Sequence, residues 1–541
     1  MKCPSCGGML YFDIKNQRLK CRNCDTVLEV DDYQGDNSAD EYLLEDARLY
    51  TCKNCGARLV SASEEAVTYC SYCGSEMILE SSMAGEKHPK FIIPFRISKS
   101  QCKKIYEKEL KNKLYVPDEF KDPDFIDRFR PFYIPYWMYQ VSFRDDEFDL
   151  DGYLSYTRGR YDYHEEYKIR ARIKDQGIYG LPYDASRNFD DTIAEQIAPF
   201  NKKDMTDYKP GYLAGMYADS PNVDAKLYEE EVLNKATDAA IQDIKRSTGG
   251  INLKLPSQKK RQELLKARYE DEDALFLPVW FLTWKKNNRV AYAVVNGQTG
   301  RIHIDLPADT KQFILYTLAG TALLFVLLSL FVSVTSRFVI WFAALLVYIV
   351  SIRYHKELKE IRDRENHVFD KGYLITDQDD LEMSEKKRSR LRNKANSLFG
   401  KIGTVASAVL AFFGIGFLII FALSGLMYDE LVSQTGAIAM TFIILFLQAF
   451  RFVKTLSVTR YLKNKRSFLF ALIALGSVVY SFLVAAGEPV QDWWYYLGGL
   501  ICLSAASLMA IDLITRYNEA STRPLPSFYT RKGGNDSAKE I

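Results

Sequence analysis

Eight of the ten cysteines in this 541-residue chain lie within its first 73 residues. They form two sets with the same spacing, Cys-x2-Cys, fourteen intervening residues and Cys-x2-Cys, and the second set repeats the first at an offset of 49. The flanking residues repeat as well, since CPSCGGML aligns with CKNCGARL. The two sets are Cys3, Cys6, Cys21 and Cys24, and Cys52, Cys55, Cys70 and Cys73.

The spacing of these cysteines is typical of tetrahedral Zn2+ sites. Each Cys-x2-Cys turn presents two thiolates to one ion, and the spacer lets the second turn approach from the other side. A glycine follows Cys6, Cys55 and Cys73, where it relieves the tight backbone of the turn. We therefore predict two zinc ribbons, each holding one structural Zn2+. The alternative is a disulfide framework, which requires an oxidising compartment, and no signal peptide precedes Cys3.

The charge of the cysteine-rich region argues against nucleic acid as its partner. Residues 1–90 hold ten Lys and Arg against fifteen Asp and Glu, a net charge of −5, and each Zn2+ with four thiolates adds about −2. A domain that binds phosphates needs the opposite sign, since Lys and Arg contacts release the counterions of the nucleic acid. We expect a self-stabilised cap or a protein-docking domain, and a membrane-tethered nucleic-acid-binding protein is the third hypothesis.

Changes in composition divide the soluble part of the chain into segments. An acidic linker or short helix separates the two ribbons, and an α+β domain with an aromatic antiparallel sheet follows them. Within that domain, DAKLYEEEVLNKATDAAIQDIKRS has apolar residues close to a 3.6-residue period, which predicts a helix. The predicted segments are ribbon 1 at 1–30, the linker at 31–50, ribbon 2 at 51–87 and the α+β domain at 88–307.

The α+β domain carries no recognisable catalytic motif. The chain has five histidines, none of them paired at metal-ligand spacing, and it has no glycine-rich phosphate-binding loop. The acidic run over 145–151 is typical of a solvated strand edge, and the aromatic residues of 133–139 are typical of core packing. We therefore predict that the protein is not an enzyme.

After Pro307 the chain contains six apolar runs within 308–516. The first has 22 residues, enough to cross about 30 Å of hydrocarbon at about 1.5 Å per residue. The second has fifteen, so it requires Arg337 and Arg353 to extend toward the interface, or local thinning of the bilayer. The predicted transmembrane helices are 313–334, 338–352, 403–427, 431–450, 468–487 and 493–514.

The loops between these runs fix the predicted orientation. The 353–401 loop carries thirteen Lys and Arg and the 451–467 loop carries six, whereas residues 428–430 and 488–492 carry none. By the positive-inside rule the basic loops and both termini are cytoplasmic. A reducing cytoplasm also keeps the cysteine thiols reduced. We predict a multi-pass protein of the bacterial inner membrane with a cytoplasmic tail at 517–541.

Few polar residues occur inside the predicted spans. Gln448 and Asp512 lie near predicted cytoplasmic ends, whereas coupled transporters usually place ionisable groups or broken helices at the midplane. Glycines such as Gly498 and Gly499 are compatible with close packing of helices. A transporter or channel subunit regulated by its cytoplasmic region is therefore the second hypothesis.

The order of motifs resembles a known group of proteins. The twin ribbon is followed by FIIPF, YIPYW, LPYDASRNFDD, GYLAGMYAD, the apolar runs and RPLPSF. In this order the chain resembles bacterial, mainly Gram-positive, zinc-ribbon membrane proteins, often labelled as containing a transcription-factor-IIB-type zinc ribbon. The resemblance implies an association with phage-shock-type envelope-stress systems and SPFH-domain scaffolds. Our first hypothesis is a membrane-anchored zinc-binding scaffold that recruits cytoplasmic proteins to the lipid bilayer.

Overall fold

The computed structural model describes residues 1–33, 48–52, 58–61, 70–73, 80–83, 89–316, 319, 336–365 and 434–524, except 112, 114, 145, 174–175, 187–188, 220, 287–288 and 463–464. Several predicted features lie outside these residues. They are the span 403–427, nearly all of the span 313–334, Cys55, most of the linker 31–50 and most of the tail 517–541.

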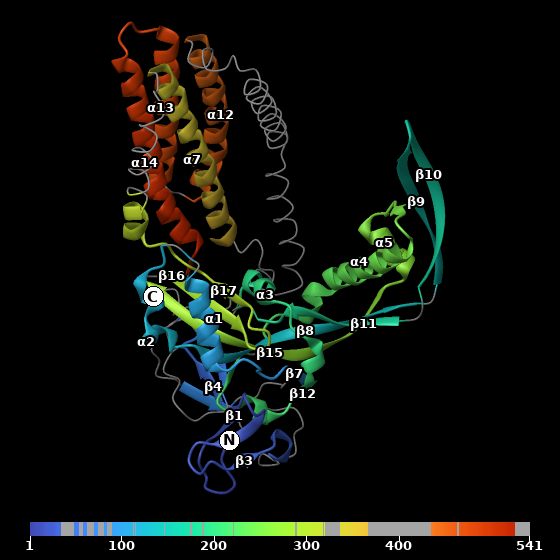
Figure 1. Ribbon diagram of the computed structural model, residues 1–541. Helices are drawn as coiled ribbons and strands as arrows, with labels where there is room; N and C mark the ends of the chain where they lie inside the picture. The colour runs from blue at the N-terminus through green and yellow to red at the C-terminus, as the bar shows by residue number, and fades with distance from the viewer. Residues whose placement is uncertain are drawn as a thin grey trace, which may run out of the picture.

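The described residues form three parts (Figure 1). The N-terminal ribbon lies at one end, a β-sheet lies in the middle, and a group of long helices stands on the opposite side of the sheet. We call this group the helical bundle, its end near the sheet the sheet end, and the opposite end the far end. Its members are α7 (Ser336–Glu365), α12 (Gln434–Tyr461), α13 (Lys465–Gly487) and α14 (Trp493–Ala520).

The sheet is built on two long antiparallel strands, β8 (Arg130–Phe143) and β15 (Arg268–Lys286). Their middle residues are buried in near-continuous runs, as expected for strands that are covered on both faces. Successive residues such as Phe132 and Tyr133 belong to different hydrophobic clusters, because neighbouring side chains of a strand point to opposite faces. The predicted core role of the aromatic residues over 133–139 is therefore confirmed for Tyr133.

Shorter strands from distant parts of the chain extend this sheet. Among the described residues the strand order is β12-β7-β15-β8-β13-β5-β4-β6; in addition β11 pairs with β8, β16 pairs with β15, and β17 and β18 pair with β16. Strands of the predicted second ribbon and a strand that follows α14 thus join one sheet. Their bounds are β4 Arg48–Thr51, β5 Arg58–Ser61, β6 Glu80–Met83, β7 Phe91–Ile92, β11 Gln176–Asp184, β12 Thr206–Asp207, β13 Tyr217–Ala218, β16 Arg289–Asn296, β17 Ile302–Ile304 and β18 Arg523–Pro524.

A long hairpin projects from the central sheet. It consists of β9 (Asp146–Arg158) and β10 (Tyr161–Ile173), which form a separate three-stranded sheet with β14 (Asn252–Leu253). The amphipathic helix α4 (Glu229–Ser247) packs at the base of the hairpin and buries its apolar face there. Helix α4 confirms the helix that was predicted from the 3.6-residue period. Helix α5 (Gln258–Leu265) follows α4 in the chain.

Smaller elements complete the soluble region. The first ribbon has its own three-stranded sheet. Two short helices pack on one face of the central sheet and a third packs on the other face. The strands of this ribbon are β1 Leu10–Asp13, β2 Arg18–Cys21 and β3 Val27–Leu28, and the helices are α1 Lys99–Lys111, α2 Pro123–Ile126 and α3 Asp191–Ile197.

All members of the helical bundle are long and apolar enough to cross a membrane, and no other described helix meets that criterion. The helices α7 and α14 run parallel in close contact, since a Cβ at Gly499 would lie 2.7 Å from Val339 Cγ1 and one at Gly498 would lie 2.9 Å from Ile340 Cδ1. Such distances require glycine, so the prediction of close helix packing at Gly498 and Gly499 is confirmed.

The described helices differ in length from the predicted spans. Helix α7 continues from the apolar run 338–352 to Glu365, and α12 continues beyond 450 to Tyr461, so each contains the first part of a predicted basic loop. The helix continues because polar side chains bond across the bundle there: Thr455 Oγ1 lies 3.2 Å from His355 Nδ1, and Tyr354 donates to the Asp512 carboxylate. Hydropathy locates the apolar part of a helix but not its end.

Candidate metal centres

The four cysteines of the first set meet at one point. Cys3, Cys6, Cys21 and Cys24 each offer a sulfur, and these sulfurs all lie within 4.8 Å of one another. Cys3 Sγ is 3.7 Å from Cys24 Sγ, and Cys6 Sγ is 3.5 Å from Cys21 Sγ. A disulfide would need about 2.05 Å, whereas two ligands of a tetrahedral ion with bonds of about 2.3 Å lie roughly 3.8 Å apart. The donor set therefore fits a metal ion.

The backbone around this first centre is shaped to carry thiolates. The Gly8 and Asn23 N–H groups each donate to a cysteine sulfur, at 3.4 Å from Cys6 Sγ and Cys21 Sγ respectively. Gly7 has a φ of +73°, which glycine adopts without strain, and this confirms the predicted role of the glycine after Cys6. A Cβ at Gly8 would lie 2.9 Å from Asn23 Cβ, so the two turns face each other closely.

Hydrogen bonding also favours the thiolate form of Cys24. The side chain of Thr26 and its backbone N–H both interact with Cys24 Sγ, and they lower the pKa of the Cys24 thiol to about 6. Because the thiolate is the form that binds metals, this contact prepares Cys24 for its predicted role.

The second set is brought together in the same way, as far as the structure describes it. The sulfurs of Cys52, Cys70 and Cys73 lie within 4.8 Å of one another, and Cys52 Sγ is 3.7 Å from Cys73 Sγ. All three are buried, whereas Cys6 and Cys24 of the first centre are exposed. The fourth predicted ligand, Cys55, lies outside the described residues.

The second centre is part of the core of the central sheet. Tyr72, between Cys70 and Cys73, is fully buried, and its ring packs edge-on against Phe132 with a centroid distance of 5.7 Å. Its hydroxyl donates to Asp219 Oδ2 at 2.6 Å, and its carbonyl accepts from the Tyr292 hydroxyl at 2.8 Å. Burial raises the pKa of Tyr72 well above its ordinary value, so this hydroxyl stays protonated and keeps donating.

One short segment, 211–219, contacts both cysteine ribbons. Its Ala214 carbonyl accepts from the Phe12 N–H of the first ribbon at 2.9 Å. Five residues later, Asp219 accepts from Tyr72 of the second. Strand β13 in this segment pairs with β5 of the second ribbon and with β8. The sequence motif GYLAGMYAD is therefore a shared docking site for the two centres, which the sequence alone did not reveal.

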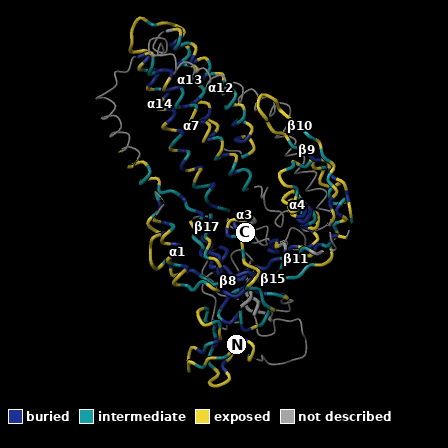
Figure 2. The backbone as a smooth tube through the Cα atoms, turned by 45° about the vertical axis from the view of Figure 1, so that its right-hand side comes forward, coloured by how far each residue is buried: buried dark blue, intermediate teal, exposed yellow. Residues whose placement is uncertain are grey.

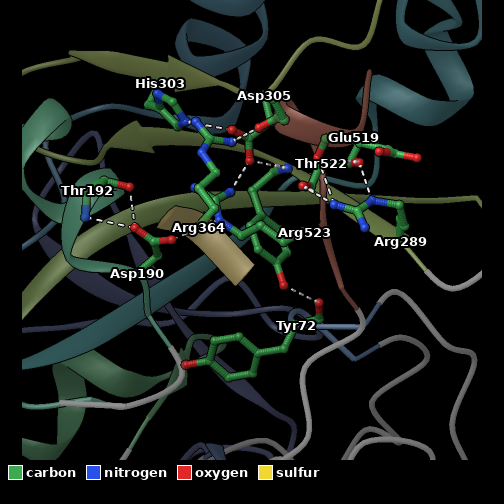
Figure 3. A network of polar contacts seen from close by, with 12 residues as sticks. Tyr72, Asp190, Thr192, Arg289, His303, Asp305, Arg364, Glu519, Thr522 and Arg523 are labelled. Carbon is green, nitrogen blue, oxygen red and sulfur yellow. Dashed lines mark hydrogen bonds and ion pairs between the residues drawn. The ribbon is translucent and has the colours of Figure 1, made fainter. Parts of the chain in front are cut away.

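A second polar site joins the central sheet to the helical bundle (Figure 3). Strand β18, three residues after α14, pairs with β16 and carries Arg523. Arg523 Nε lies 2.9 Å from Asp190 Oδ2, and its NH1 group is paired with Asp305 Oδ2. We call Arg523, Asp190 and Asp305 the C-terminal clamp.

Further contacts surround the C-terminal clamp. Arg289 donates to the Thr522 carbonyl at 2.8 Å and to the Glu519 carbonyl at 2.7 Å, and Arg364 of α7 donates to the Ala520 carbonyl. Asn518 exchanges two hydrogen bonds with Ala308, at 2.7 and 3.0 Å. The last turn of α14 is therefore fixed to the sheet by backbone and side-chain contacts.

The charges of the C-terminal clamp stabilise one another. Burial by itself raises the pKa of Asp190, but Arg523 and the Thr192 hydrogen bonds outweigh it and hold that pKa at about 2. Burial also opposes ionisation of Asp305, whose pKa is nevertheless lowered by Arg523 and His303. Both aspartates are thus ionised at neutral pH. No local pattern in the sequence pointed to this site, because its three members come from three separate segments.

Other predicted features lie where the sequence placed them. The acidic residues Glu147, Asp149 and Asp151 are exposed on β9, as predicted for a solvated strand edge. Tyr136 and Tyr139 are buried in the sheet core.

Comparison with known proteins gives one relative of substantial length. No family model matches the chain, and no solved structure matches it. The uncharacterized protein YdjG of Bacillus subtilis (strain 168) is 28% identical over 306 residues, which are 56% of this chain and 88% of YdjG. The chain is thus similar to a bacterial protein over slightly more than half of its own length.

Proposed function

We propose that this chain is a polytopic protein of the bacterial inner membrane that holds a zinc-stabilised cytoplasmic module against the bilayer and recruits cytoplasmic proteins to it. In this proposal it belongs to the zinc-ribbon membrane proteins that it resembles, and its partners are SPFH-type or phage-shock-type proteins of an envelope-stress response. Each part of the proposal has its own support.

The main support for this proposal is that the second cysteine centre and the end of α14 both pack on the same central sheet. The second cysteine centre packs into the core of the central sheet through Tyr72, and the same sheet accepts β18 and the C-terminal clamp from α14. A module fixed to its anchor in this way keeps a constant orientation toward the membrane. Holding a binding surface at the bilayer also raises its effective concentration for partners that are already there.

Zn2+ is the proposed metal. Cysteine thiolates in a tetrahedral set of four favour Zn2+, which has no redox chemistry and is well suited to structural sites. In the first centre all four residues are in place, and Cys55 is the proposed fourth ligand of the second. A structural ion supplies folding energy to small ribbons, which bury little apolar surface.

Six spans with both termini in the cytoplasm are proposed from the positions of the described ends. Phe313 contacts Tyr115 at the sheet end, with ring centroids 5.1 Å apart, whereas Ser336 donates to Asp492 at the far end. Phe313 and Ser336 are therefore at opposite ends of the bundle. Glu365 and the start of α12 are also at opposite ends, because Ala437 of α12 packs beside Trp341 near the start of α7. We assign the crossings between these ends to the apolar runs 313–334 and 403–427, which lie between the described ends in the sequence. The basic loops then lie on the cytoplasmic side.

A transporter or channel subunit is the second candidate, and one observation favours it. Buried polar side chains meet between the helices of the bundle: Gln448 Nε2 donates to Ser351 Oγ at 2.9 Å, and Arg516 Nε lies 3.3 Å from Asp512 Oδ2. These residues bond to one another between the helices, which suits a structural role better than an ion pathway. Catalysis and nucleic-acid binding are not part of our proposal.

Purification from membranes tests the scaffold proposal. The full chain with an affinity tag should co-purify specific cytoplasmic proteins from mildly solubilised bacterial membranes, identified by mass spectrometry. A matched variant, Tyr72→Phe/Arg523→Ala, weakens the contacts of the sheet with the second centre and with the helices, and it should lose these partners while remaining in the membrane. Identical recovery of partners by both proteins would contradict the proposal, as would the absence of any protein above an unrelated membrane control.

A further inference from the structure

A polar stretch of the helical bundle separates the central sheet from the apolar segments of the helices. The last thirteen residues of α7, 353–365, include nine charged ones, whereas 338–352 has none. Charged side chains are costly in hydrocarbon, so the polar stretch lies below the membrane core. At about 1.5 Å per residue it separates the sheet from the hydrocarbon by about 20 Å.

The β9–β10 hairpin extends across this distance. In two views that differ by 45°, its tip lies at the level of the bundle, beyond the sheet end of α7 and α14 (Figures 1 and 2). Strand β9 has 13 residues, which at about 3.3 Å per residue give a length of about 40 Å. The hairpin is therefore long enough to reach the surface of the membrane that the helices cross.

The tip of the hairpin carries an exposed aromatic face. Tyr156 is directly opposite Tyr163, and because side chains alternate along a strand, Tyr161 and Arg158 share their face. The three tyrosines are 40%, 42% and 72% exposed for Tyr156, Tyr163 and Tyr161. The rings of Tyr156 and Tyr163 stack with centroids 5.2 Å apart. Tyrosine has an apolar ring and a polar hydroxyl, which is why it is enriched at membrane interfaces.

The turn of the hairpin adds positive charge to this face. Arg158 and Arg160 flank Gly159, whose φ is +69°, and both arginines are exposed. Within the described part of the chain neither arginine forms an ion pair, although Arg170 nearer the base pairs with Asp149 at 3.2 Å. Asp162 also lies in this segment, so residues 156–163 have a net charge of +1, and the tip is basic and aromatic. Anionic lipid headgroups attract such basic groups.

We propose that residues 156–163, the hairpin tip, lie in the headgroup layer of the cytoplasmic leaflet and bind anionic phospholipid there. This inference rests on the cytoplasmic orientation in the proposed function but not on its metal or its protein partners. The hairpin is then a second membrane contact that fixes the tilt of the sheet beneath the bilayer.

Tryptophan fluorescence with quenching lipids tests this contact. The full chain carrying Tyr161→Trp is reconstituted in nanodiscs of phosphatidylcholine with about one third phosphatidylglycerol, and its emission is compared with that of the parent protein. Lipids brominated near the headgroup should quench the added tryptophan at least about twofold. The matched control is Leu255→Trp, at a residue that is 45% exposed near the base of the hairpin, and it should be unaffected by these lipids.

Charge and lipid composition separate lipid binding from mere proximity. Adding Arg158→Glu/Arg160→Glu to the Tyr161→Trp chain should reduce the quenching to the level of the control, whereas Lys259→Glu/Lys260→Glu on α5 should preserve it. Nanodiscs without phosphatidylglycerol should also reduce the quenching, and this arm needs no further substitution. Quenching at residue 161 no stronger than at residue 255 would overturn the proposal. Equal quenching with and without phosphatidylglycerol would overturn the assignment of an anionic phospholipid as the ligand. Co-purification of protein partners is a separate readout, so failure here leaves the scaffold proposal to its own test.

Discussion

Arg523 Nε lies 2.9 Å from Asp190 Oδ2, although the two residues are 333 positions apart. Asp190 is the N-cap of helix α3, where its side chain accepts from the Thr192 N–H, and Arg523 follows the last helix of the bundle. This ion pair connects the central sheet to the helical bundle at the C-terminal end of α14. The chain also enters the bundle beside the same sheet, at Ala308.

Arg523→Ala should detach the C-terminal strand from the sheet. Removing one partner of a buried ion pair leaves uncompensated charge, here on Asp190 and Asp305, and typically costs about 3–5 kcal/mol. We expect a lower thermal unfolding midpoint of the soluble region in detergent and faster proteolysis after Ala520. Arg170→Ala is the control, because its pair with Asp149 is exposed and should contribute less than about 1 kcal/mol. Equal effects of the two substitutions would contradict a structural role of the C-terminal clamp.

The stability of the C-terminal clamp should depend on pH in the acid range. Because Arg523 holds the pKa of Asp190 at about 2 when the protein is folded, below an unfolded value of about 3.9, the stabilisation is fully present above about pH 5. It is lost progressively as the pH falls from about 5 to about 1, with a total of about 2–3 kcal/mol. Proteolysis rates of the parent and Asp190→Asn proteins, measured with an acid-active protease, should therefore converge over this interval. A difference that stays constant down to pH 2 would argue against the pair.

The full chain should contain about two zinc ions, one for each cysteine set. Cys21→Ser/Cys24→Ser should reduce this to about one, because a centre with two remaining thiolates cannot complete tetrahedral coordination. Metal analysis by mass spectrometry measures the ratio of zinc to protein. Cys102→Ser serves as the control, since Cys102 is buried on α1 outside both centres and its loss should leave the zinc content unchanged. Zinc content that is insensitive to the double substitution would refute the assignment.

Tyr72→Phe should loosen the second centre from the sheet without removing its metal. The substitution deletes the hydroxyl that donates to the buried Asp219, and a lost buried hydrogen bond of this kind costs about 1–3 kcal/mol. Hydrogen exchange of the β13 and β5 amides should accelerate, while the zinc content stays at the parent value. Loss of one zinc ion in this variant would show that Tyr72 supports the metal itself.

Cysteine labelling should establish the topology. A cysteine placed at Gln491, in the short loop before α14, should react with a membrane-impermeant thiol reagent in intact cells. A cysteine at Ser384, within the predicted basic loop, should react only after the cells are permeabilised. Labelling of Ser384→Cys in intact cells would show that the proposed orientation is reversed or that one of the proposed spans does not cross the membrane.

The sequence by itself identified the features that depend on neighbouring residues. Cys3, Cys6, Cys21 and Cys24 were predictable as one centre because two short turns and one spacer fix the spacing of their ligands. The apolar face of α4 was predictable from its period, and the long apolar helices of the bundle were predictable from their runs of apolar residues. In each case the physical cause operates within one helix or one turn.

Only the tertiary structure showed how these parts are joined. Three contacts connect segments that are between 147 and 333 residues apart. They are the hydrogen bond of Tyr72 with Asp219, the pairing of β18 with β16, and the C-terminal clamp. Their residues follow no period, because a tyrosine, an aspartate or an arginine becomes a partner only when the chain brings its counterpart within hydrogen-bonding distance. The ends of α7 and α12 were not predictable for a related reason, since polar contacts between helices, rather than hydropathy along one helix, accompany their extension beyond the apolar runs.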